Sequence, residues 1–512
     1  MKIRYIYTIV AIFALSACSD FLEPKSQSEY VPKDANALQE MLIGSAYPAH
    51  KGGGYILTYL EFFSDDIQLH KTDYQFNINN AGEAKALQAA FTWQPDMFFT
   101  MTLNSYNIHN IWDGYYDYIL GANAALDYID DVEGTDDEKN YVRAQAYALR
   151  SFYYFMLVNH FGAPYNYNRD ALGVPLKLDS QLASSENLLQ PRNTVEDVYN
   201  QILKDLDEAE RLFIDLPEAK QNPSEYLVGL PMIQLLKSRV YLYMERWADA
   251  QTYAAKVIND WSFVLHNLNS STYAATAMKP YYNFTNTRAK SPEIIWLYGK
   301  ISDLTDLFDG TVTRTDNGTT LLRNAFTAST TLLNSFKTGD LRKDKYISKE
   351  FDRQNNVFLA SNYSAFGKYN ITERGVPDGS ANFALSFRLS EAYLNLAEAA
   401  AFNGQEDVAR DAIHTLLQNR YSAGTIEDAT GLSGNDLQQF IRDERRKELC
   451  MEGQRWFDLR RYGMPALTHA WDNQNYTLQA EDPSYTMPIP EAVLERNTKL
   501  VQNPLAPARQ PG

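Results

Sequence analysis

Cysteine is almost absent from this chain of 512 residues, which contains Cys18 and Cys450 and no others. Two cysteines exclude a framework of disulfides, and the sequence has neither a CxxC pair nor an HExxH motif to hold zinc. Glycine-rich phosphate loops of the GxGxxG or P-loop type are also missing. The sequence therefore predicts no metal site, no cofactor and no catalytic residues.

Positive charge is scarce as well. Lysine and arginine total 47 against 64 acidic residues, which gives a net charge of −17. An acidic chain without a basic run argues against binding to nucleic acid. After the first 17 residues, no stretch of 18 uninterrupted apolar residues occurs, so the sequence predicts no membrane-spanning helix in the body of the chain.

The N-terminus has the pattern of a targeting segment. Lys2 and Arg4 precede an apolar run that ends in Leu15–Cys18. This ending resembles a bacterial lipobox, in which the signal is cleaved before a cysteine that then carries acyl chains; the alternative is an ordinary signal peptide. We expect residues 1–17 to be a lipoprotein signal, Cys18 to be the lipidation site, and residues 18–33 to form a lipidated tether.

Apolar residues recur with helical spacing in five parts of the body. Two of these parts read as helical hairpins with short turns and with alanines at their crossing points, a design that resembles tetratricopeptide repeats. The sequence predicts a mainly α fold in which helix pairs of this kind build a superhelical scaffold, with a few short strands. The five segments are residues 104–130, 137–160, 194–213, 231–259 and 386–420.

Two regions lack helical periodicity, residues 47–100 and 260–382. Both are long, polar and rich in aromatic residues, and long loops tend to be functional. Each ring either anchors its loop to the core or offers a flat surface for a sugar or peptide. The candidate ligand-binding residues are Tyr74, Trp93, Tyr273, Tyr281 and Tyr282.

Two charged motifs have open roles. Asp65 and Asp66 are adjacent carboxylates, for which a structural or capping role is favoured over catalysis or cation binding. The segment 442–463 begins as a helix that carries both signs of charge, which Gly453 can end. It is either a solvated helix with internal ion pairs, a segment that fixes the last helices to the core, or part of a surface that faces a partner protein. We do not expect the ligand to bind there.

Several blocks together resemble the SusD/RagB family of outer-membrane nutrient-binding lipoproteins, over nearly the full length. The C-terminal hallmark is the most specific of them, and the lipobox at Cys18 agrees with it. The blocks are Leu149–Phe155 with Phe161–Pro164, Pro191–Tyr199, Arg445–Leu449 with Glu452–Arg460, and Met487–Pro490 with Asn503–Pro504.

This resemblance implies one domain over residues 34–512, with about four tetratricopeptide-like helix pairs, mainly in 104–260 and 386–462, and a loop-rich half that binds ligand. It implies no catalysis. It implies a lipid-anchored protein on the outside of the outer membrane, which passes a glycan to a SusC-like TonB-dependent transporter. A peptide ligand and a scaffold that binds only proteins remain alternatives.

Overall fold

The computed structural model describes most of the chain. Cys18, Tyr74, Tyr273, Tyr281 and Tyr282 lie outside the described residues. The described ranges are residues 32–48, 60–70, 75–76, 81–104, 111–182, 189–270, 288–289, 291–299, 311–316, 319–352, 357–364, 385–427 and 429–512.

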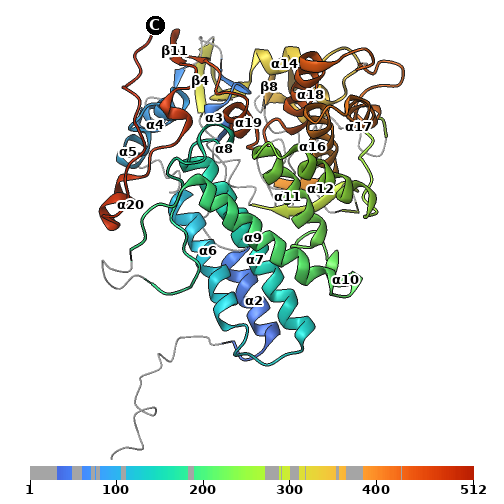
Figure 1. The fold of residues 1–512 in the computed structure, drawn as a ribbon. Coiled ribbons are helices and arrows are strands. Elements are labelled where there is room, and N and C mark those ends of the chain that lie inside the picture. The colour runs from blue at the N-terminus through green and yellow to red at the C-terminus, as the bar shows by residue number, and fades with distance from the viewer. Residues whose placement is uncertain are drawn as a thin grey trace, which may run out of the picture.

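Four long helices form an elongated bundle at the lower end of the molecule in Figure 1. Helix α7 packs against α6 and α9, and α2 packs against α6 and α7. Thr135 and Thr194 begin α7 and α9 with capping boxes, in which the N-cap side chain and the acidic residue at the third helical position each bond the other's backbone N–H. The helices are α2 (Ala35–Ala46), α6 (Ile111–Tyr128), α7 (Asp136–Phe161) and α9 (Val195–Ile214).

Two helical hairpins lie beside this bundle, and they pack on one another although 129 residues lie between Asn259, the end of the first, and Leu389, the start of the second. The contact runs between the second helix of one hairpin, α12, and the first helix of the other, α16. Ala250 and Ala254 are buried in α12, where their small side chains allow close approach. The hairpins are α11 (Leu230–Tyr243) with α12 (Trp247–Asn259), and α16 (Leu389–Phe402) with α17 (Glu406–Gln418). The expectation of a mainly α, tetratricopeptide-like scaffold is therefore confirmed.

The second half of the fold combines short helices with small antiparallel sheets. Strand β3 pairs with β9, β1 with β6, β7 with β8 and β10 with β11, and β2, β4 and β5 form a three-stranded sheet. The strands are β1 (Ile67–Leu69), β2 (Gln75–Phe76), β3 (Ile294–Tyr298), β4 (Thr311–Asp316), β5 (Thr319–Asn324), β6 (Phe326–Ala328), β7 (Ser348–Asp352), β8 (Val357–Ser364), β9 (Leu385–Arg388), β10 (Leu467–Trp471) and β11 (Gln474–Leu478).

Three details differ from the sequence-based expectations. The region 47–100 contains helices at Leu60–Phe63 and Ala81–Phe91 and the first part of another at Met97–Leu103, because apolar residues such as Phe62, Leu87 and Met101 are buried in the core. The helix expected from residue 104 begins at Ile111 instead, and Asn104 caps the preceding helix. The charged helix ends at Leu449 rather than at Gly453.

The remaining helices are α3 (Leu60–Phe63), α4 (Ala81–Phe91), α5 (Met97–Leu103), α8 (Tyr165–Asn168), α10 (Glu218–Gln221), α14 (Thr330–Ser335), α15 (Arg342–Tyr346), α18 (Gly434–Leu449), α19 (Arg455–Arg461), η4 (Pro483–Tyr485) and α20 (Glu491–Arg496).

Within the described ranges, no helix has both the length and the apolar character needed to cross a bilayer. The same ranges contain no group of three or more histidine, cysteine or acidic side chains placed to hold a metal ion.

Candidate functional site

A cleft of about 870 Å³ opens between β1, α4, the start of α14 and the β10–β11 hairpin. The hairpin turn places Asp472 and Asn473 at the cleft, and both have positive φ, as a two-residue turn between antiparallel strands requires. Four segments that are distant in sequence thus supply its walls. They are residues 65–70, 84–91, 329–331 and 468–473.

Amides and hydroxyls dominate the polar lining of the cleft. The carboxamide oxygen of Gln68 accepts hydrogen bonds from the backbone N–H of Thr330 at 2.8 Å and from its hydroxyl at 3.1 Å. The amide of Gln88 donates to the hydroxyl of Tyr476 at 3.3 Å. These bonds orient the two glutamines, and an oriented amide can offer both a donor and an acceptor to a ligand.

Asp65 forms the floor of the cleft, and two arginines of the C-terminal charged segment hold its carboxylate. Arg455 donates from Nε to Oδ1 at 2.7 Å and from Nη2 to Oδ2 at 3.0 Å, and Arg446 Nη2 lies 3.2 Å from Oδ2. Burial acts to raise the pKa of Asp65, but the hydrogen bond from Arg455 and the charges of both arginines outweigh it and lower the pKa to about 2. The carboxylate is therefore ionised, and 24% of the side chain remains exposed.

Asp66 lies directly behind this floor and is fully buried. Arg446 donates from Nε to its Oδ1 at 2.7 Å, and the hydroxyl of Ser329 donates to the backbone oxygen of Asp65 at 2.6 Å. Burial raises the pKa of Asp66, and the charge of Asp65 adds to that rise. The pair has the structural role that the sequence favoured, because it ties residues 65–66 to α14 and α18. The sequence did not indicate that Asp65 also faces a cleft.

Trp93 is part of a stack of three rings behind the cleft. The imidazole of His469 lies between the rings of Phe91 and Trp93, with centroid distances of 4.0 and 4.1 Å. Trp93 is 2% exposed, and its indole N–H donates to the backbone oxygen of Phe63 at 3.1 Å. The expected stacking platform is thus a packing residue here, since its ring face is covered by His469.

The segment 442–463 is a connector between distant parts of the chain rather than a solvated helix. Arg445 binds Asp458 at 2.9 Å and donates to Asn395 of α16 at 2.8 Å, and Arg461 binds Glu398 of α16 at 2.6 Å. Glu444, Arg445, Lys447 and Glu448 are buried. The expectation that this segment fixes the last helices to the repeat core is confirmed.

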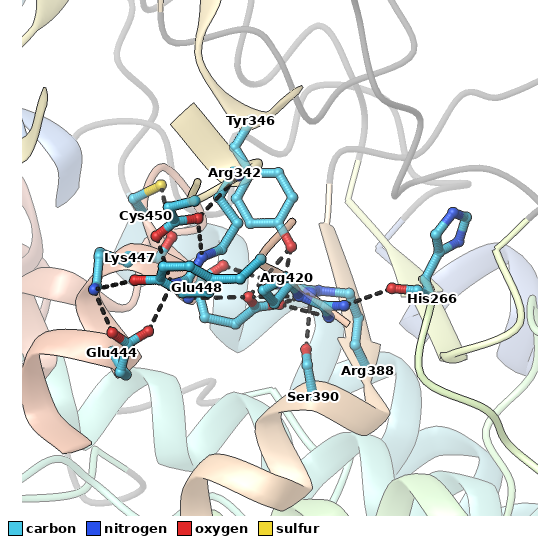
Figure 2. Close-up of polar contacts among 12 residues, drawn as sticks. His266, Arg342, Tyr346, Arg388, Ser390, Arg420, Glu444, Lys447, Glu448 and Cys450 are labelled. Atoms are coloured by element: carbon cyan, nitrogen blue, oxygen red, sulfur yellow. Dashed lines mark hydrogen bonds and ion pairs between the residues drawn. The ribbon is translucent and has the colours of Figure 1, made fainter. Parts of the chain in front are cut away.

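Glu448 of this segment lies at the centre of a buried group, the Glu448 cluster, which also contains Arg342, Arg388, Arg420 and Glu293. Figure 2 shows Glu448 with the three arginines. Arg388 Nη1 and Arg420 Nη2 lie 2.9 and 3.0 Å from Glu448 Oε1, and both arginines also bind Glu293. Burial acts to raise the pKa of Glu448, but Arg420 and Arg388 outweigh it and hold the pKa well below its usual range.

Tyr346 completes this cluster from α15, with its hydroxyl 3.1 Å from Glu448 Oε1. No ligand can reach these groups, because Glu448, Arg342 and Arg420 are 0% exposed. The cluster instead connects α15, β9 and α18 with Glu293, directly before β3, and Arg420, just after α17. It is a structural feature that holds the strand-rich part on the helical scaffold.

Comparison with known proteins agrees with this arrangement. The family model described as SusD family matches residues 272–505, and the model described as starch-binding associating with outer membrane matches residues 20–226. The chain belongs to the SusD/RagB family. A SusD-like protein of Formosa agariphila is 25% identical over 385 residues, which cover 68% of this chain and 71% of the relative.

Solved structures of the SusD superfamily share the fold. A SusD-like carbohydrate binding protein from Bacteroides vulgatus has a TM-score of 0.64 at 22% identity, covering 91% of this chain and 97% of that one. A SusD superfamily protein from Bacteroides thetaiotaomicron has a TM-score of 0.66 at 20% identity, with 92% and 98% covered. At these identities the likeness establishes the fold alone.

Proposed function

We propose that this SusD/RagB protein binds an oligosaccharide in the cleft between β1, α4 and β10. The observation that carries the proposal is the lining of oriented amides, hydroxyls and one fixed carboxylate around about 870 Å³. Sugar hydroxyls both donate and accept hydrogen bonds, so they match such a lining, and the volume is within the range of known ligand pockets. The description of the family model and the carbohydrate-binding neighbour support the same ligand class.

The geometry of Asp65 and Asp66 supports binding without catalysis by this pair of acids. Hydrolysis of a glycosidic bond requires a second carboxylic acid on the opposite side of the scissile bond, with a raised pKa for proton donation. The adjacent acid, Asp66, has a raised pKa but is 0% exposed behind Asp65. Asp65 itself is held ionised by Arg455 and Arg446. Neither residue can donate a proton to a ligand in the cleft.

Cellular context forms the second part of the proposal. Cys18 carries the lipid anchor, the protein faces outward from the outer membrane, and the ligand passes to a SusC-like TonB-dependent transporter. Two acyl chains or more give a stable anchor, since each buried methylene contributes about 0.8 kcal/mol. Replacing Cys18 by Ala should abolish labelling by radioactive palmitate and release the protein from membranes. Palmitate labelling of the alanine variant would contradict this assignment.

Titration calorimetry of the purified protein against oligosaccharides tests the binding proposal. We expect heat of binding with at least one glycan and none with peptides of similar length. If the protein binds peptides and no glycan, the cleft is a peptide-binding site instead. Tyr74, Tyr273, Tyr281 and Tyr282 remain proposed contacts, and each alanine variant of these tyrosines should then weaken glycan affinity.

A further inference from the structure

The carboxylate of Asp65 is held by ion pairs and is also partly exposed to solvent. In this it differs from Asp66 and from the acids of the Glu448 cluster, which are buried. Two bonds from Arg455 and the contact with Arg446 hold its position. A carboxylate offers about four acceptor positions. Arg455 makes its two hydrogen bonds to different oxygens of the carboxylate, and 24% of the Asp65 side chain is exposed at a residue that lines the cleft.

Gln68 supplies the complementary group three residues further along. Its carboxamide oxygen is occupied by Thr330, which leaves its amino group as a donor on the cleft that Asp65 also lines. A donor and an acceptor on one cleft suit a sugar, one hydroxyl of which donates to the carboxylate while another accepts from the amide. Hydrogen bonds to an ionised acceptor are about twice as strong as neutral ones.

The charges at the cleft also restrict the ligand. Its lining contains the carboxylates of Asp65 and Asp472, the buried His469 and the ammonium of Lys85, which lies exposed on α4. An acidic substituent placed against Asp65 would face a carboxylate that the two arginines keep negative. A hydroxyl in the same place gains a charge-assisted hydrogen bond.

We propose that Asp65 contacts the ligand directly by accepting a hydroxyl hydrogen, and that it makes the cleft select neutral sugars over acidic ones. This inference rests on the proposed glycan binding. It assigns the floor residue of the cleft a role beyond its ion pairs, and it names neutral, hydroxyl-rich oligosaccharides as the ligand class.

The test compares Asp65→Asn with Asp66→Asn by calorimetry against two sets of probes. Neutral probes are maltoheptaose, cellohexaose, xylohexaose and mannohexaose, and acidic probes are hexagalacturonate and hexaguluronate. Asp65→Asn should weaken the best neutral probe by about tenfold or more. It should also reduce the preference for neutral over acidic probes, a readout that a purely structural residue would not change.

Asp66→Asn is the matched control, because it loses a bond from the same Arg446 but does not line the cleft. It should lower the melting temperature while the folded protein keeps its affinity within about twofold. Thermal melts of both variants establish that folded protein is compared. Should Asp65→Asn fail to fold, Gln68→Leu provides the same comparison from the donor side, with an expected loss of severalfold in affinity.

The outcomes separate this inference from the proposed function. A wild-type protein that binds no glycan overturns both. Wild-type binding that Asp65→Asn leaves unchanged in strength and preference overturns this inference alone. A wild-type preference for the acidic probes that disappears in Lys85→Gln also overturns it, since Lys85 would then select the ligand.

Discussion

Helix α18 serves two charged environments that differ in their access to solvent. Glu448 meets Arg388 and Arg420 in a cluster whose side chains are at most 1% exposed. Arg446, two residues earlier, instead reaches Asp65 on the floor of an open cleft. Positions two apart on a helix point to nearly opposite sides. One short motif can therefore both lock the fold and shape the ligand site, with different residues for each task.

The comparison indicates what each region can tolerate. A fully buried ion pair is costly to form and more costly to break, because a remaining charge has no water to solvate it. A partly exposed pair at the cleft can exchange partners with water or a ligand. We therefore expect changes in the Glu448 cluster to affect folding, and changes at Asp65 to affect binding.

The largest effect is expected for Glu448→Gln. The change leaves Arg420 with Glu293 as its remaining carboxylate partner among the described residues, whereas Arg388 keeps both Glu293 and Glu452. Breaking a buried pair costs about 3–5 kcal/mol. Urea denaturation should show a loss near the upper end of that range, or the variant should accumulate poorly. A loss below about 1 kcal/mol would show that the cluster is dispensable.

Trp456→Ala should have the next largest effect. The ring is 1% exposed, stacks on Tyr485 at a centroid distance of 4.6 Å and packs against Phe63 at 5.4 Å. Truncating a buried tryptophan costs about 3–5 kcal/mol through the cavity that it leaves. Chemical denaturation measures this loss, and calorimetry on the folded fraction should find ligand affinity little changed. A selective loss of affinity without a loss of stability would contradict the structural role.

A smaller effect should follow acidification through His469. Its ring nitrogens lie 2.7 Å from the backbone oxygen of Phe91 and 2.9 Å from that of Ser64, and burial lowers its pKa to about 4 despite these contacts. Unfolded histidine has a pKa of about 6.5, so the unfolded chain takes up the proton first. Stability that is present above pH 6.5 is lost as the pH falls toward 4, by about 3 kcal/mol for this residue.

Denaturation at a series of pH values measures that loss. Since His160 and His266 are also buried with lowered pKa values, the informative quantity is the difference from His469→Phe. The variant should show a shallower decline in unfolding free energy between pH 6.5 and 4. Equal slopes for the two proteins would contradict the assignment.

The smallest effect is expected for Asp113→Asn. Arg496 binds Asp113 at 2.7 Å with a geometry as good as that of the buried pairs, but the two side chains are 60% and 43% exposed. Exposed pairs contribute about 0–1 kcal/mol. Unfolding curves of the variant should nearly overlay those of the wild type. A loss of unfolding free energy as large as that of Glu448→Gln would contradict the distinction between buried and exposed pairs.

The helices could be predicted because their signals are local. Thr194 and Asp197 lie three residues apart, and the apolar stripe of α9 follows at once. Helix α4 was not predicted, because its alanines and Gly82 form no clear apolar stripe and the polar residues around it are typical of a loop.

The partners of charged residues could not be predicted, because they are distant in sequence. The charge pattern of α18 suggested internal pairs, and one of these forms, between Lys447 and Glu444. Glu448 instead meets arginines 28 and 60 residues away. The same is true of the candidate site. The sequence points to Asp65 as one of two adjacent carboxylates, but the cleft that it lines also needs the β10–β11 hairpin, about 400 residues later.

The prediction that Trp93 stacks on a ligand also depended on contacts that are distant in sequence. Its surroundings in sequence are polar, yet the ring is covered by His469 from β10. Whether a ring is a platform or part of the core depends on contacts that sequence spacing does not contain.

A crystal structure of the protein with the tightest neutral oligosaccharide tests the account most directly. We expect the sugar between β1, α4 and β10, with one hydroxyl within about 3 Å of an Asp65 carboxylate oxygen and the Glu448 cluster unchanged. A sugar bound elsewhere on the molecule, with this cleft empty, would contradict the assignment of the site.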